Sequence, residues 1–240
     1  MSSQSFFKNH FYSFNMRVIY KLLQVAIFIL PLIAMRQDKP LRVIFFGDSI
    51  TQAGVGPTGY ITKMSEMLKS KGQDSQYELM GAGIGGNKVY DLYLRLEDDV
   101  LSKKPDVVFI YVGINDVWHK TSSGTGTDPD KYVKFYEALI KKMKAQNIRV
   151  IVCTPTVIGE KNDNSNPQDG DLNQYSKLIR EIATRNSLQL CDLRKSFQDY
   201  LVQNNPENKE KGILTSDRVH LTDEGNKFLA ERMMEALVQK

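Results

Sequence analysis

The sequence predicts an α/β fold, a three-layer sandwich in which about five parallel strands form a sheet with helices on both faces. Short runs rich in β-branched and aromatic residues alternate with longer runs of helical spacing, and no internal repeat is visible. The strongest strand, Val107–Val112, is apolar on both faces, as expected at the centre of a parallel sheet. The length of 240 residues, with 41% hydrophobic and 25% charged residues, suits one domain after an N-terminal extension.

The first predicted strand, residues 43–46, ends in a small polar turn, Gly47-Asp48-Ser49-Ile50-Thr51. Sites in open α/β sheets lie outside the carboxyl ends of the strands, so Ser49 occupies a position suited to a nucleophile. Gly47 lets the backbone bend there without a Cβ clash. The alternative is an ordinary strand-to-helix turn in which Asp48 or Ser49 caps the next helix.

The other predicted elements continue this alternation. Further strands are predicted at residues 77–80, 107–112, 150–153 and 188–191. Helices are predicted at residues 59–71, 88–101, 129–145, 172–186, 193–202 and 223–238. Polar loops rich in Gly or Asn are expected at residues 120–128 and 155–169.

An apolar run near the N-terminus, residues 22–35, follows two basic residues, a pattern typical of secretory signals. The run is shorter than the about 20 residues that cross a bilayer. We therefore interpret residues 1–37 as a signal peptide or N-terminal anchor segment and residues 38–240 as one folded domain. Met16 is an alternative start. Ala34–Gln37 matches a cleavage site poorly, so an uncleaved anchor and a buried core helix stay open. The predicted location is periplasmic, secreted or membrane-anchored through this segment.

The formal net charge is +4, and part of the basic excess lies before residue 43. The remainder is close to neutral and has no basic tract, which disfavours nucleic acid as a partner. Cys153 and Cys191 lie in predicted strands without the spacing of zinc ligands, so we expect buried, unreactive thiols. Export would permit a disulfide, but two residues inside a parallel sheet rarely have suitable geometry.

Candidate bases are scarce, because only His119 and His220 follow the apolar run. A serine nucleophile needs a base to accept its proton and an acid to orient that base. Asp217 stands three residues before His220, where a short loop can fold its carboxylate onto the imidazole. The alternative is that Asp217 caps a turn and His220 is a surface residue.

Two further turns could stabilise negative charge on a substrate oxygen. The Gly85-Gly86-Asn87 turn follows the second predicted strand and can expose backbone N–H groups. Asn115 follows the third strand and offers a side-chain amide. Both could instead be simple turns, since Gly and Asn are common turn residues.

Together these stretches resemble the SGNH hydrolase family, also called the GDSL esterase/lipase family. The four matching blocks, in the family's order, are Gly47-Asp48-Ser49-Ile50, Gly86, Asn115 within Gly113–Asp116, and Asp217 with His220. One block alone is a weak signal, whereas four in order across almost the whole domain are a strong one. Ile50 replaces the family's usual leucine, and Gly83 or Gly85 could be aligned in place of Gly86.

The resemblance implies a flavodoxin-like fold and a serine esterase that needs no cofactor or metal. It implies that Ser49 attacks an ester carbonyl, that His220 acts as base and then acid, and that Asp217 orients His220. It also implies an oxyanion hole made of the Ser49 and Gly86 N–H groups and the Asn115 side chain. The G-x-S-x-G motif of α/β-hydrolases is absent, which disfavours that family.

Three more residues are candidates for substrate binding: Asp48, Trp118 and His119. Asp48 is expected to support the nucleophile turn by hydrogen bonding. Trp118 and His119 follow the Asn115 block, where they could line a substrate pocket or lie in an exposed loop.

We therefore expect an exported serine esterase acting on small acyl esters, including acetyl groups on carbohydrate. The carbohydrate part rests on export and on resemblance to secreted family members. A lysophospholipase or acyl-thioester hydrolase using the same site is the first alternative, although the nearby loops are polar. A non-catalytic binding module is the second alternative, which the intact set of catalytic residue types disfavours.

Overall fold

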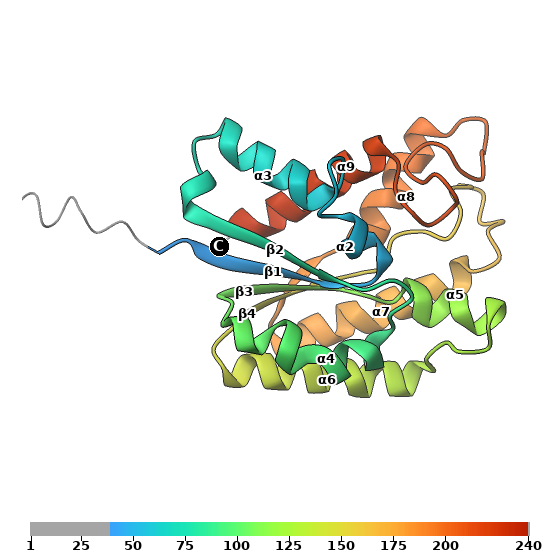
Figure 1. Cartoon of the computed structure of the whole chain (residues 1–240). Coiled ribbons are helices and arrows are strands. Elements are labelled where there is room, and N and C mark those ends of the chain that lie inside the picture. The colour runs from blue at the N-terminus through green and yellow to red at the C-terminus, as the bar shows by residue number, and fades with distance from the viewer. Residues whose placement is uncertain (1–38, 240) are drawn as a thin grey trace, which may run out of the picture. The chain divides into compact units, whose positions relative to one another are not determined.

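A five-stranded parallel sheet forms the centre of the computed structural model, which describes residues 39–239 (Figure 1). Its strands are β1 (Leu41–Gly47), β2 (Tyr77–Gly83), β3 (Val107–Tyr111), β4 (Arg149–Cys153) and β5 (Gln189–Cys191). Their order across the sheet is β2-β1-β3-β4-β5, and every neighbouring pair is parallel. The predicted α/β class is confirmed.

Helices cover both faces of this sheet (Figure 1). One face carries α3 (Tyr60–Ser70), α8 (Leu193–Asn204) and α9 (Asp223–Val238). The other face carries α4 (Val89–Asp99), α6 (Pro129–Ala145) and α7 (Asp169–Asn186). Two shorter helices, α2 (Ser49–Ala53) and α5 (Ile114–Ser122), lie at the end of the sheet where β1 and β3 finish.

The two central strands are apolar on both sides because helices cover both sides. All residues of β3 are at most 3% exposed, and residues 43–46 of β1 are fully buried. The register partners Phe45 and Phe109 stack with ring centroids 4.9 Å apart, and Tyr60 meets Phe45 edge to face at 5.6 Å. Each such pair stabilises the fold by about 0.5–1.5 kcal/mol beyond simple burial. These contacts anchor β1 next to the turn that carries Ser49.

A topological switch point lies between the carboxyl ends of β1 and β3. The chain leaves β1 toward α3 on one face and leaves β3 toward α6 on the other. Ligand sites of doubly wound sheets form in the crevice that opens where the connections diverge. Gly47 and Tyr111 are register partners at this point, and Ser49 and Asn115 follow them closely along the chain.

Two α-helices of the described residues were not predicted from the sequence. The five residues of α2 and the nine of α5 are too few for a helical repeat of apolar residues to stand out. The sequence analysis ended the third strand at Val112 and treated residues 113–116 as a turn, whereas α5 begins at Ile114. Of the two alternatives for Trp118 and His119, the exposed loop is wrong, because both residues lie on α5 and are partly buried.

From Pro40 onward the chain forms one compact unit. The predicted signal or anchor segment, residues 1–37, lies outside the described residues. Within residues 39–239, none of the helices combines the length and the apolar character needed to cross a bilayer. Cys153 and Cys191 are buried register partners on β4 and β5 without a disulfide between them, and burial raises the pKa of the Cys153 thiol well above its usual value.

Candidate active site

Ser49 is the first residue of α2, one residue beyond the turn that follows β1. A Cβ on Gly47 would lie 2.5 Å from the Tyr111 carbonyl oxygen, so only glycine lets β1 and β3 approach so closely there. The Asp48 carboxylate caps α2 by accepting a hydrogen bond from the Ile50 N–H at 3.0 Å. Both the capping alternative and the nucleophile position considered from the sequence are therefore present in one turn.

Asp48 is only 2% exposed, and burial raises its pKa to about 6. Its backbone carbonyl also accepts the Gln52 N–H at 2.9 Å, which closes the first turn of α2. The Gln52 side chain in turn accepts a hydrogen bond from the Gly85 N–H at 2.8 Å. This arrangement suits support of the Ser49 turn and offers Asp48 no exposed surface for a substrate.

Three side chains from opposite ends of the domain form a hydrogen-bonded chain. Ser49 Oγ lies 2.9 Å from His220 Nε2, and His220 Nδ1 lies 2.7 Å from Asp217 Oδ2. The His220 and Asp217 side chains remain 39% and 51% exposed, so solvent and substrate can reach them. The arrangement allows His220 to accept the Ser49 proton while Asp217 fixes the tautomer of the imidazole.

Asp217 is also held by backbone donors of its own loop. Its Oδ1 accepts the N–H groups of Val219 at 3.1 Å and of His220 at 2.8 Å. Burial alone would raise the pKa of Asp217, but the hydrogen bonds from His220 and Val219 outweigh it and hold this pKa below its usual value. Asp217 is therefore a carboxylate at neutral pH, ready to stabilise a protonated His220.

The two expected oxyanion stretches lie beside each other. Asn115, which is 3% exposed, donates a hydrogen bond from Nδ2 to the Asn87 carbonyl oxygen at 3.1 Å. An amide nitrogen carries two hydrogens, so a second donor remains for a substrate. Gly86, the residue before Asn87, has φ +75°, a conformation that glycine adopts without strain. The sequence alignment with Gly86 is thus supported by its place beside Asn115.

Arg95, on α4, was missed by the sequence analysis. Its Nε donates to Asn87 Oδ1 at 2.7 Å, and its Nη2 donates to the carbonyl oxygens of Gly47 at 2.7 Å and Ala82 at 3.1 Å. The guanidinium also lies 4.5 Å from the Phe46 ring centre. Arg95 therefore ties the ends of β1 and β2 to the Gly86–Asn87 turn. No sequence pattern distinguishes it from the other basic residues of an amphipathic helix.

Asp116 joins α5 to the start of α4. It is fully buried, and both of its carboxylate oxygens accept a hydrogen bond from the Val89 N–H, at 3.2 and 3.3 Å. Burial raises the pKa of Asp116 to about 7. Since Asn115 precedes Asp116 and the Gly86–Asn87 turn precedes Val89, this contact keeps both oxyanion stretches at a fixed separation.

His119 is placed at the site, whereas Trp118 is partly buried. A Cβ on Gly86 would lie 3.8 Å from His119 Cε1, so the imidazole borders the oxyanion turn. Burial, and then the charge of Lys88, lower the pKa of His119. Trp118 packs partly against the hydrophobic core, with its ring centroid 5.8 Å from that of His119. His119 is neutral at pH 7 and can donate or accept a hydrogen bond beside Gly86.

A profile of the GDSL-like lipase/acylhydrolase family matches residues 45–228. The chain belongs to this family. Its four motif blocks all lie inside the matched range, and the resemblance seen in the sequence is confirmed. The chain is accordingly a hydrolase of the class that cleaves carboxylic esters. Within residues 39–239, His, Cys, Asp and Glu side chains nowhere gather in threes with the geometry of a metal site.

Several known proteins are similar to this chain along most of their length. The crystal structure of an acetyl xylan esterase, AlAXEase, is 65% identical, with a TM-score of 0.82, over 82% of this chain and 100% of that chain. The acetylxylan esterase of Geobacillus stearothermophilus is 28% identical over 80% of this chain and 92% of its own length. The uncharacterised lipoprotein YqeF of Bacillus subtilis is 23% identical over 82% of this chain and 89% of its own length.

Proposed function

We propose that this protein is a serine esterase that removes acetyl groups from xylan or xylo-oligosaccharides. The observation that carries the proposal is the hydrogen-bonded chain from Ser49 through His220 to Asp217, with distances of 2.9 and 2.7 Å. The 65% identity to an acetyl xylan esterase supports the substrate class. Structures of the Geobacillus esterase also support the residue roles. Its variants described as catalytic mutants replace a serine, an aspartate and a histidine three residues after that aspartate.

In the proposed first half-reaction, Ser49 Oγ attacks the acetyl carbonyl carbon while His220 Nε2 takes the Ser49 proton. The carbonyl oxygen becomes an oxyanion, held by the N–H groups of Ser49 and Gly86 and by the free hydrogen of the Asn115 amide. The intermediate collapses when the bond to the sugar oxygen breaks. His220 then gives its proton to that oxygen, so the sugar leaves as an alcohol and Ser49 carries the acetyl group.

The second half-reaction repeats the same steps with water. His220 takes a proton from the water, whose oxygen attacks the acetyl-serine carbonyl carbon. A second oxyanion forms in the same hole, and its collapse breaks the bond to Ser49 Oγ. The proton returns from His220 to Ser49, and acetic acid is released. Asp217 stabilises the protonated His220 in both halves.

We propose that His119 contacts the sugar side of the substrate. It borders Gly86, and its imidazole can hydrogen-bond a hydroxyl group without carrying a charge. Trp118 contributes the exposed part of its ring to the same rim. Asp48 is given a supporting role because it is buried below Ser49.

Export is part of the proposal. It rests on the basic and apolar pattern before residue 38, and the lipoprotein relative YqeF is consistent with it. N-terminal sequencing of the protein purified from its own host tests this. A chain that begins near residues 35–38 supports cleavage, and a chain that retains residues 22–35 supports the anchor instead.

The decisive assay compares the purified protein with its Ser49→Ala variant. We expect release of acetate from acetylated xylan and from 4-nitrophenyl acetate, and loss of both activities in the variant. A series of 4-nitrophenyl esters of increasing chain length tests the preference for acetyl groups. Faster cleavage of long-chain esters or lysophospholipids would replace the carbohydrate substrate by a lipid. No ester cleavage by the folded protein would indicate a binding module.

A further inference from the structure

The loop that carries Asp217 and His220 is closed at its base. Thr215 and Leu221 form an isolated antiparallel bridge, and the Ser216 N–H donates to the His220 carbonyl oxygen at 2.8 Å. Next to this bridge, the Thr222 N–H donates to the Leu214 carbonyl oxygen at 2.9 Å. The positions of Asp217 and His220 therefore depend on where this base is held relative to the sheet.

A buried carboxylate, Glu160, holds that base. Glu160 is fully buried, and its Oε1 accepts the Leu214 N–H at 2.7 Å and the Thr215 hydroxyl at 2.8 Å. The Thr215 N–H also donates to Oε1. The Ile213 N–H donates to Oε2 at 2.9 Å. Four donors thus converge on one carboxylate, and all four come from the three residues that begin the loop.

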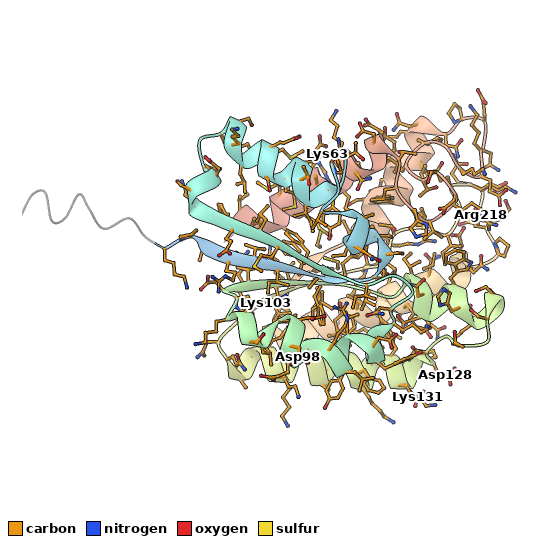
Figure 2. The ribbon with its side chains drawn as sticks, viewed as in Figure 1. Lys63, Asp98, Lys103, Asp128, Lys131 and Arg218 are labelled. Atoms are coloured by element: carbon orange, nitrogen blue, oxygen red, sulfur yellow. The ribbon has the colours of Figure 1, made fainter. Side chains whose placement is uncertain are left out.

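The residue before Glu160 holds the far side of the same loop. The Gly159 N–H donates to the Arg218 carbonyl oxygen at 2.8 Å, and Arg218 directly follows Asp217. Arg218 has φ +87°, which is a strained backbone conformation for a residue other than glycine, and the hydrogen bond from Gly159 helps to hold it. Figure 2 shows Arg218 at the outer rim, at the same end of the molecule as α5.

Glu160 is itself fixed from outside the loop. Its backbone carbonyl oxygen accepts a hydrogen bond at 2.8 Å from the side chain of Asn205, the residue that follows α8. Its backbone N–H donates to the Glu210 carbonyl oxygen at 2.9 Å. A buried carboxylate costs several kcal/mol of lost hydration unless donors replace the water. Here the replacement donors belong to the catalytic loop, so the carboxylate is satisfied only when the loop has its native position.

We propose that Glu160 is a positioning residue that sets the Asp217–His220 pair against Ser49. This inference rests on the proposed function of the triad. Glu160 lies in the polar segment 155–169, which the sequence analysis treated only as a loop. A displacement of about 1 Å in a catalytic group can lower the rate about 10²-fold. Loss of the Glu160 contacts therefore lowers kcat much more than it changes KM.

Glu160→Gln is the main test because it keeps the shape and removes the charge. The new amide N–H₂ group is a donor and replaces one carboxylate oxygen. It therefore faces either the Ile213 N–H or the three donors at the Oε1 position, and those hydrogen bonds are lost. With 4-nitrophenyl acetate we expect kcat to fall about 10-fold or more, with KM within about twofold of the wild-type value. Glu181→Gln is the matched control. Its carboxylate pairs with Lys177 on the exposed surface of α7, outside the loop, and the kcat of this variant should stay at the wild-type value.

A second pair of variants tests the same contact more gently, so that the test stands if Glu160→Gln does not fold. Thr215→Val removes one donor to Glu160 at constant side-chain shape, whereas Thr215→Ser keeps the hydroxyl. We expect Thr215→Val to lower kcat several-fold and Thr215→Ser to retain most of it. Circular dichroism and the melting temperature identify the folded variants.

A double-mutant cycle separates positioning from general loosening of the fold. If Glu160 acts by setting the Asp217–His220 pair against Ser49, Glu160→Gln should add little to the loss already caused by His220→Ala. An equal loss in both backgrounds, or a wild-type kcat in folded Glu160→Gln or Thr215→Val, overturns the inference. These outcomes are distinct from failure of the proposed function, which would appear as activity retained by Ser49→Ala.

Discussion

Arg95 Nε donates a hydrogen bond to Asn87 Oδ1 at 2.7 Å, and Asn87 accepts the Asn115 amide through its carbonyl oxygen at 3.1 Å. A single residue, Asn87, thus connects Arg95 on α4 to the Asn115 amide that is expected to hold the oxyanion. The same guanidinium bonds the Gly47 carbonyl oxygen at the end of β1. Two parts of the candidate site that are far apart in the sequence share this one side chain.

The first prediction concerns Arg95. Arg95→Lys should lower kcat on the order of 10-fold with little change in KM, because one ammonium cannot bridge the four acceptors that the planar guanidinium reaches. Arg185→Lys is the control, since Arg185 forms a half-exposed pair with Glu137 on the protein surface. Steady-state kinetics with a short ester measures both. Equal rates for the two folded variants would remove Arg95 from the site.

The second prediction concerns the oxyanion. Asn115→Ala should lower kcat by about 10²–10³-fold while KM changes little, because the amide is needed mainly in the transition state. The loss should be the same for acetyl and propionyl esters, since the oxyanion is common to both. An unchanged kcat in a folded variant would show that Asn115 serves only the Asn87 turn.

The third prediction treats Ser49, His220 and Asp217 as one unit. Ser49→Ala and His220→Ala should each abolish nearly all esterase activity, and the double variant should be scarcely worse than either. Asp217→Ala should be milder because the base remains. Activity should also fall at acidic pH, since a protonated His220 cannot accept the Ser49 proton. Wild-type rates in folded His220→Ala would redirect the search for the base to His119.

The fourth prediction concerns pH and stability. Burial raises the pKa of Asp116 from 3.8 to about 7. Between these pH values the folded protein holds a proton that the unfolded chain has released, so the free energy of unfolding falls as the pH rises. The loss from this one group is on the order of 2–4 kcal/mol at pH 8.

Asp116→Asn removes this titration and keeps an oxygen to accept the Val89 N–H. Its melting temperature should exceed that of the wild type by several degrees at pH 8, with a smaller difference at pH 5. Calorimetry at the two pH values checks this. A difference of equal size at both would mean that Asp116 is not protonated in the folded state at the lower pH.

The fifth prediction concerns His119. His119→Ala should raise KM for acetylated xylo-oligosaccharides several-fold and leave kcat for 4-nitrophenyl acetate nearly unchanged, because only the sugar reaches the imidazole. Lys120→Ala, one residue further along α5, is a suitable neighbour control. An equal effect on the two substrates would instead assign His119 to support of the Gly86 turn.

The parts of the structure that could be predicted are those with a local signal. Residues 107–112 are apolar without interruption, so the central strand was evident, and the turns after β1 and β3 stood out by their polar residues. Asp217 and His220 could be paired because only three positions separate them. The short helices α2 and α5 had too few residues to show a helical period.

Arg95 and Glu160 could not be found in this way. Arg95 bonds Gly47, which is 48 positions away in the chain, and Glu160 bonds Leu214, which is 54 positions away. Such pairings depend on how the helices and loops pack. A charged residue in an amphipathic helix or polar loop is ordinarily exposed to solvent. In the folded protein both side chains are drawn inward and hold parts of the site, and the local sequence does not indicate this.

Ser49 and His220 are 171 positions apart, and the segment with His220 directly precedes α9, the last helix described. The proposed nucleophile is therefore synthesised 171 residues before its proposed base. Under the proposed mechanism, a partly synthesised chain that lacks that segment has no base for Ser49. Recovery of esterase activity during refolding accordingly reports that the segment with His220 has packed beside Ser49. The rate of this recovery measures how fast the complete domain folds.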